Sequence, residues 1–203
     1  TTFHQETATH NKSFKLKFTL TRAQIIIFSV GSLWGFAHHG LFNFLPLYFA
    51  DSVKIGFGAV LGIGFLTGLV LLLGILGQLI GGQLGERFHR KSLYIWVVAL
   101  NIPFLIMMAF YNETLLIGIT CILGAVNFMF QPVNNSLLAD ETPKDQRGII
   151  YGISAGISFG IGSLAGIVGG YIGEIFSINY IFPSMAVILI PAVILAIVLK
   201  KIK

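Results

Sequence analysis

The chain has 203 residues, of which 55% are hydrophobic and 10% are charged, and its mean hydropathy is +0.86. Soluble domains carry about a quarter charged residues, so this composition excludes a soluble fold and predicts an integral membrane protein. The formal net charge of +5 follows from the membrane topology described next, and we expect no nucleic-acid partner.

Six long apolar stretches predict six membrane-spanning helices, because each reaches or nearly reaches the ~20 residues that a helix needs to cross the hydrocarbon. They are expected at about 24–50, 56–84, 93–110, 115–138, 148–173 and 177–199. The runs do not alternate as the strands of a membrane β-barrel do. The predicted fold class is therefore all-α: a polytopic membrane protein with a basic cytoplasmic linker over 1–22 and a six-helix transmembrane bundle over 23–203.

The basic residues predict the orientation of this bundle. All of the Lys and Arg residues except Lys54 fall on one side of the membrane once the stretches are marked. They are Lys12, Lys15, Lys17, Arg22, Arg87, Arg90, Lys91, Lys144, Arg147, Lys200, Lys201 and Lys203. Cytoplasmic loops retain Lys and Arg, so we expect a cell-membrane protein with both termini in the cytoplasm.

The opening segment, TTFHQETATHNKSFKLKFTLTRA, is polar and basic and has no apolar core of a signal peptide. It resembles a linker between two domains. We therefore expect the chain to be the second half of a longer protein.

Polar side chains inside apolar helices are costly and are the first candidates for a solute site. In the first stretch, His39 and Asn43 share a helix face, with Trp34 about one turn away and His38 adjacent. Two interpretations of these histidines stay open. They carry a coupling proton, because free imidazole titrates near neutrality, or they stay neutral and hydrogen-bonded.

The loop after the second stretch reads GQLGERFHRKSL and combines one acid with several cations. Glu86, Arg87 and Arg90 can bridge to a neighbouring helix end, and such pairs gain more in a partly dry gate than in water. The alternative is that these cations only anchor the topology.

The fourth stretch carries a polar stripe. Asn127, Gln131 and Asn134 recur at i, i+4 and i+7, which places three amides on one helix face. Amides donate and accept hydrogen bonds, so they suit polar, uncharged groups of a solute. Hydrogen bonding between helices is the alternative role.

The segment ADETPKDQRG is expected to begin the fifth helix, with Thr142 as the cap, Pro143 at the first helical position and Asp145 completing a capping box. Glycines then recur at intervals of four, which makes a smooth groove that lets another backbone approach closely. They are Gly148, Gly152, Gly156 and Gly160. Static packing and a moving interface both fit this pattern.

Two of the cytoplasmic loops carry a family resemblance. The segment 82–93 is similar to Gly-x-x-x-Asp-Arg-x-Gly-Arg-Arg/Lys, and PKDQRGIIYG at 143–152 is similar to Pro-x-x-x-Arg-Gly-x-x-x-Gly. The matching residues of the first motif are Gly82, Arg87, Arg90 and Lys91. Glu86 replaces the Asp, and His89 replaces a turn glycine, where a left-handed backbone would disfavour it. The chain thus resembles the C-terminal six-helix half of a major facilitator superfamily transporter.

This resemblance implies two inverted three-helix repeats, a cavity lined by the first and fourth helices, and a cytoplasmic gate. The cavity candidates are Trp34, His38, His39, Asn43, Asn127, Gln131 and Asn134. The gate candidates are Gly82, Glu86, Arg87, Arg90, Lys91, Arg147 and Gly148.

The implied function is secondary transport of a small solute by alternating access, and we favour proton-coupled efflux of organic or drug-like compounds. Uptake of a sugar, nucleoside or organic acid, and a non-transporting membrane bundle, are the alternatives. No Asp or Glu lies deep in these helices, so the decisive acid of a proton-coupled transporter would belong to the other half. The expected partners are the lipid bilayer, a small-molecule solute, and the missing N-terminal six-helix half or a second copy.

We expect no enzyme activity, no catalytic residue, no cofactor and no metal ion. Ser154 lies in a Gly-Ile-Ser-Ala-Gly sequence, but a nucleophile of this kind needs a turn between strand and helix, and here the segment is helical. The single cysteine, Cys121, makes neither an internal disulfide nor a cysteine metal cluster.

Overall fold

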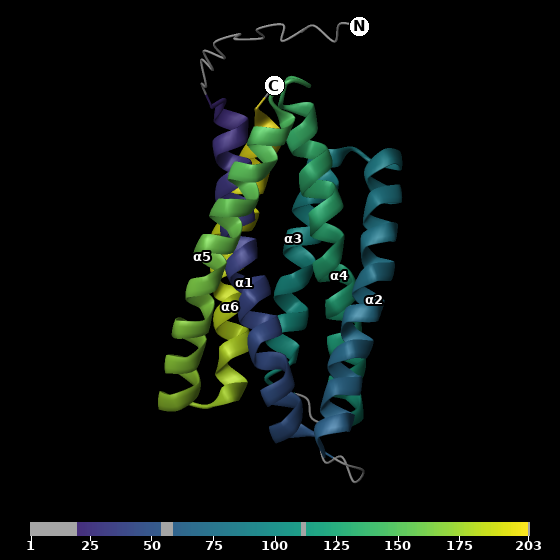
Figure 1. Ribbon diagram of the computed structural model, residues 1–203, viewed down its shortest axis with the longest axis vertical. Helices are drawn as coiled ribbons and strands as arrows, with labels where there is room; N and C mark the ends of the chain where they lie inside the picture. Colours follow the sequence, from purple (N-terminus) through teal and green to yellow (C-terminus); the bar gives the residue numbers. More distant parts are fainter. Residues whose placement is uncertain (1–19, 54–58, 111–112, 203) are drawn as a thin grey trace, which may run out of the picture.

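The computed structural model describes residues 20–53, 59–110 and 113–202. Within them the chain folds into long helices that stand side by side (Figure 1). The helices are α1 (Arg22–Ser52), α2 (Ala59–Arg87), α3 (Arg90–Met107), α4 (Glu113–Asp140), α5 (Arg147–Ile175) and α6 (Ile181–Lys201), with a short 3-10 turn at Ile178–Tyr180 before α6. By length and composition, six helices in the described part of the chain are able to span a membrane, which confirms the predicted polytopic all-α fold.

The start of α1, the end of α6 and the α2–α3 and α4–α5 connections lie at one end of the bundle (Figure 1). Every basic residue that the structure describes lies at this same end, on these helix termini or in the α4–α5 turn. The charge asymmetry of the sequence is therefore carried by one end of the folded bundle. That this end faces the cytoplasm stays a prediction, and most of the predicted linker falls outside the described residues.

The helix contacts follow a twofold pattern, in which each contact that α1 makes with one of the last helices has a counterpart made by α4 with one of the first helices. The first helix, α1, packs against α5 and α6, and α4 packs correspondingly against α2 and α3. Contacts between α3 and α6 join the two groups. Because α1 and α4 run in opposite directions along the bundle (Figure 1), this is the arrangement that two inverted three-helix repeats would give.

Helices α2 and α4 pack backbone against backbone at glycines that the sequence pattern did not single out. A Cβ built on Gly77 would overlap the carbonyl oxygen of Ala125 and lie 2.8 Å from its Cα. Facing it from α4, a Cβ on Gly124 would lie 2.8 Å from the carbonyl oxygen of Val70. Only glycine permits this backbone approach.

The regular glycines of α5 do not pack inside the bundle. A Cβ on any of the four would meet nothing within 4 Å among the described residues, and all four glycines are exposed. They are Gly148, Gly152, Gly156 and Gly160. The contact with α1 is made instead by Gly162 and Gly169, against His39 and Phe44. A packing role for the four-residue repeat would therefore have to involve something outside the described bundle.

The predicted capping motif of the fifth helix is wrong, although the helix itself begins close to the expected residue 148. Thr142 does not cap it, because residues 143–146 form a separate turn, in which Gln146 N–H donates to the carbonyl of Pro143 at 3.0 Å. The helix α5 begins at Arg147 with Gln146 as its N-cap residue. A true capping box occurs at α1, where Thr21 and Gln24 exchange side-chain and backbone hydrogen bonds.

Candidate functional site

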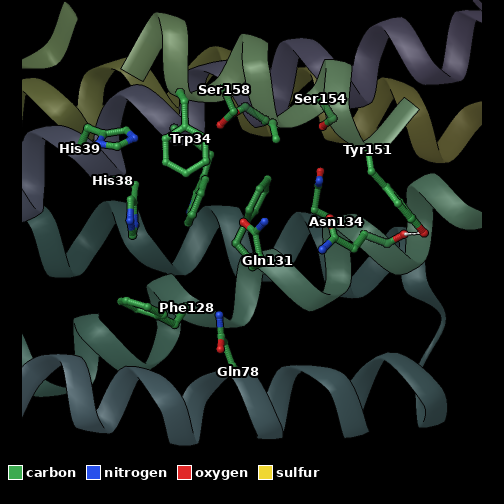
Figure 2. Close-up of a pocket in the computed structure, with 16 residues that line it drawn as sticks. Trp34, His38, His39, Gln78, Phe128, Gln131, Asn134, Tyr151, Ser154 and Ser158 are labelled. Carbon is green, nitrogen blue, oxygen red and sulfur yellow. Dashed lines mark hydrogen bonds between the residues drawn. The ribbon is translucent and has the colours of Figure 1, made fainter. Parts of the chain in front are cut away.

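A cavity of about 480 Å³ lies among α1, α2, α4 and α5. Figure 2 shows Trp34, His38 and His39 of α1 on one side and Gln131 and Asn134 of α4 beside them. The other residues that line the cavity are Gly31, Gly35, Gln78, Phe128, Phe130, Asn135, Tyr151, Ser154, Ala155, Ser158 and Phe159. This size suits a small organic solute, because ligand pockets usually measure roughly 300–1,000 Å³.

The cavity brings together five of the seven residues predicted for it, from α1 and α4. Asn127 is buried just behind the wall and does not line it. Asn43 is exposed on α1 and also lies outside the lining. The third wall, with Tyr151, Ser154 and Ser158 of α5, was missed. Its signal in the sequence is a polar stripe at i, i+3 and i+7.

A buried chain of hydrogen bonds supports the α1 and α4 walls. His38 Nδ1 lies 2.6 Å from Asn127 Oδ1, and Asn127 Nδ2 donates to Asn101 Oδ1 of α3 at 2.9 Å. Asn101 Nδ2 in turn donates to the carbonyl of Val97 at 2.7 Å. A second contact joins α3 to the wall, since the Tyr94 hydroxyl donates to Asn134 Oδ1 at 2.9 Å.

Aromatic rings surround His38. Trp34 stacks on it with ring centroids 4.6 Å apart, and on its other face Trp34 stacks on Phe130 at 4.2 Å. The Trp34 indole N–H is buried and has no hydrogen-bond partner among the described residues. An unpaired buried donor costs about 1–3 kcal/mol, so the ring is held there by stacking rather than by hydrogen bonding.

The lining residues include no Asp, Glu, Lys or Arg in the part of the chain that the structure describes. Its polar groups are amides, hydroxyls and two imidazoles, set among aromatic rings. Several lining residues stay open to the outside, and Phe159 is 64% exposed. The described bundle therefore forms part of a wall around a solute-sized space and leaves one side uncovered.

The gate candidates lie at the basic end of the bundle. Arg90 Nη1 donates to Asp140 Oδ1 at 2.5 Å, and Lys91 Nζ lies 3.5 Å from Glu141 Oε1. Lys91 also donates to the carbonyl of Ile202 at 2.9 Å, beyond the end of α6. These contacts connect the start of α3 to the ends of α4 and α6.

Two details of the predicted gate loop differ in the structure. Only Phe88 and His89 separate α2 from α3, so Glu86 and Arg87 belong to the last turn of α2. His89 has φ −63°, and the left-handed conformation that would disfavour it is not required. Glu86 and Arg87 are exposed and make no side-chain hydrogen bond or ion pair within the described segments. The acids that pair with this loop, Asp140 and Glu141, come from the end of α4.

The α4–α5 turn is fixed by side chains from both directions. Arg147 donates to the carbonyls of Ala139 at 3.0 Å and Thr142 at 3.3 Å. From α1, Gln24 Nε2 donates to the Glu141 carbonyl and to the Thr142 hydroxyl oxygen, each at 3.0 Å. The remaining two gate candidates, Gly82 and Gly148, have open space where a Cβ would lie.

Replacing Gln24 by Leu should lower the stability of the bundle. The change removes the capping box and leaves the buried Thr142 hydroxyl without its donor, which costs about 1–3 kcal/mol. Thermal unfolding in detergent measures the shift. Gln83→Leu, at an exposed amide near the same end of α2, is the matched control and should leave the midpoint unchanged. Equal midpoints for both variants would contradict the assigned role of Gln24.

Together these features define a polytopic α-helical membrane protein with an uncharged, solute-sized polar cavity between its spanning helices. The sequence matches the Major Facilitator Superfamily over residues 3–166 and 52–203, and the chain belongs to this family. No curated protein matches the sequence.

Two solved structures are similar to the chain. The in meso crystal structure of the POT family transporter PepTSo aligns with a TM-score of 0.79 at 13% sequence identity, over 91% of this chain and 38% of that one. The crystal structure of an auto inhibited POT family peptide transporter gives 0.73 and 13%, over 90% of this chain and 38% of that one. This chain thus corresponds to less than half the length of each of these proteins, and the similarity concerns the fold.

Proposed function

We propose that the chain forms one half of a secondary transporter that moves a small solute across the cell membrane by alternating access. The observation that carries this proposal is the uncharged polar cavity between helices long and apolar enough to span a bilayer. Polar groups at such depth are costly and are retained where a solute or ion contacts them. Membership of the Major Facilitator Superfamily supports transport over an enzymatic role.

A second six-helix body would complete the cavity, either the N-terminal half of the same transporter or a second copy of this chain. Lining residues remain open on one side, including exposed Phe159 and Gln131. On α5, Gly152 and Gly156 lie beside the lining residue Ala155 on the helix surface, and a Cβ on either glycine would meet nothing within 4 Å among the described residues. On α2, Gly82 lies one turn from the lining residue Gln78 and is equally open.

Proton-coupled efflux of an organic or drug-like compound is the transport mode that we favour, with the basic end of the bundle in the cytoplasm. Amides and aromatic rings without fixed charge suit an uncharged or amphipathic solute. Because the lining has no carboxylate in the described residues, an acid that carries the proton would come from the other half. Sugar, nucleoside or organic-acid uptake is the alternative that the first experiment tests.

The first experiment blocks the cavity. Ser154→Trp places a large side chain in the cavity from its α5 wall. Transport should fall at least about tenfold, which corresponds to a loss of about 1.4 kcal/mol of solute binding. Proteoliposomes containing the complete transporter and a pH-sensitive dye would be offered radiolabelled chloramphenicol, as an uncharged drug-like compound, and radiolabelled glucose, uridine and lactate. Ser29→Trp, outside the cavity on α1, is the control and should keep the wild-type rate. Equal rates for both variants would contradict the cavity as the solute site.

We propose that the ion pairs of Arg90 and Lys91 hold part of the cytoplasmic gate. Arg90 and Asp140 are 37% and 47% exposed, so their pair should contribute less than about 1 kcal/mol to folding. Arg90→Gln should therefore leave the unfolding midpoint nearly unchanged but alter the transport rate, by up to about fivefold. Lys200→Gln removes a charge from the same end without a described partner and should change neither. If Arg90→Gln transports at the wild-type rate, the proposed gate role is contradicted, and these cations serve only to orient the protein in the membrane. Glu86 and Arg87 would act in this gate by contacting the other half.

A further inference from the structure

The hydrogen-bond chain behind the cavity has a fixed direction. It ends at the backbone carbonyl of Val97, which can only accept, so the Asn101 group that faces it must be the amide NH₂. Asn101 Oδ1 then points the other way and accepts from Asn127 Nδ2. Reversing either amide would bring two acceptors or two donors together, so the backbone carbonyl sets the orientation of both.

The same direction determines the tautomer of His38. Asn127 presents its oxygen to His38 Nδ1 at 2.6 Å, and an oxygen of an amide cannot donate. The neutral imidazole must therefore carry its hydrogen on Nδ1. Its Nε2 is left with a free lone pair and no described partner, on a ring that lines the cavity beside Trp34 (Figure 2).

We propose that His38 Nε2 is the specificity-determining acceptor of the cavity and binds an uncharged O–H or N–H donor of the solute. Asn127 and Asn101 are positioning residues, because they fix the tautomer without lining the cavity. The identity of the solute group rests on the proposed transport function, whereas the tautomer follows from the described bundle alone.

The surroundings of His38 select a neutral donor over a cation. Its ring contacts Trp34, Phe42 at 4.8 Å and Phe128 at 5.6 Å, and the other titratable ring beside it is His39 at 5.6 Å. No carboxylate lines the cavity within the described residues. A cationic amine would lose its hydration here without a counter-charge, which is far costlier than burying a hydrogen-bonded hydroxyl or amide.

The tautomer can be measured by nitrogen NMR on protein labelled with ¹⁵N-histidine in lipid nanodiscs at neutral pH. The nitrogen with a hydrogen and the nitrogen without one resonate far apart, and the spectrum of His38→Gln identifies the His38 signals. We expect Nδ1 protonated and Nε2 bare. Asn101→Leu removes the anchor and should let the Nε2–H form appear. A wild-type His38 with hydrogen on Nε2, or on both nitrogens, would overturn the proposal even if the Asn101 variant failed to fold.

Phenol and anisole then serve as matched probes, since they share a flat ring and differ in the hydroxyl donor. Phenol should shift the His38 Nε2 resonance at a concentration at least about tenfold lower than anisole does. A tenfold difference in affinity corresponds to about 1.4 kcal/mol, the contribution expected from the hydrogen bond that only phenol can donate. Equal shifts, or none, would overturn the proposed acceptor role. Failure of transport in proteoliposomes would contradict the proposed function but would leave the tautomer and the probe shifts as they are, so the two failures can be told apart.

Discussion

Gly77→Ala is expected to destabilise the protein strongly, because the added methyl group has no room between α2 and α4. The added Cβ would overlap the Ala125 carbonyl oxygen and lie 2.7 Å from the carbonyl carbon, both of which are backbone atoms of α4. Backbone atoms cannot rotate away, so α2 and α4 would have to separate along their closest contact. Overpacking of this kind costs about 1–3 kcal/mol or more. Thermal unfolding followed by circular dichroism should show a clearly lower midpoint and reduced yield.

Gly68→Ala is the matched control on the same helix. A Cβ at this position meets nothing within 4 Å among the described residues. Alanine favours a helix over glycine by about 1 kcal/mol, so this variant should unfold at the same temperature or slightly higher. The two changes are chemically identical and differ only in what the methyl group meets. If Gly68→Ala lowered the unfolding midpoint as much as Gly77→Ala does, the requirement for glycine at position 77 could not be attributed to the α2–α4 contact.

The helices themselves were predictable because hydrocarbon imposes a length and an apolar composition on any spanning segment. Their ends were less so. The capping motif placed the start of α5 four residues too early, since Thr142 and Pro143 fit a helix N-terminus locally, whereas the helix begins at Arg147. The structure uses Thr142 as an acceptor for Gln24, which is 118 residues away along the chain. A local pattern carries no information about such a distant partner.

The fourth-helix amides illustrate the same limit at the cavity. Asn127, Gln131 and Asn134 share one face, but only Gln131 and Asn134 line the cavity. Asn127 is covered by His38 and by Asn101 of α3. Spacing along a helix predicts which side chains point together, whereas burial depends on which other helices lie over them. The gate shows this as well, because its acids come from the end of α4 and not from the α2–α3 connection.

Gly156→Leu is expected to abolish transport while leaving the described bundle stable. The glycine is exposed, a Cβ there meets nothing within 4 Å in the described chain, and it lies on α5 beside the lining residue Ala155. If a second six-helix body closes the cavity against this face, the leucine holds the two backbones apart. About 2.7 kcal/mol of overpacking at that interface would lower the transport rate roughly a hundredfold.

Gly162→Leu separates this effect from ordinary unfolding. Gly162 is on the same helix but faces α1, where a Cβ would overlap the His39 ring and lie 3.0 Å from the Gly35 carbonyl oxygen. This variant should lose transport because the bundle itself is destabilised, with a lowered unfolding midpoint, whereas Gly156→Leu should keep the wild-type midpoint. Normal transport by Gly156→Leu would show that no helix closes on this face. A lowered midpoint in both variants would contradict the expected separation between the contact with a second body and the stability of the bundle.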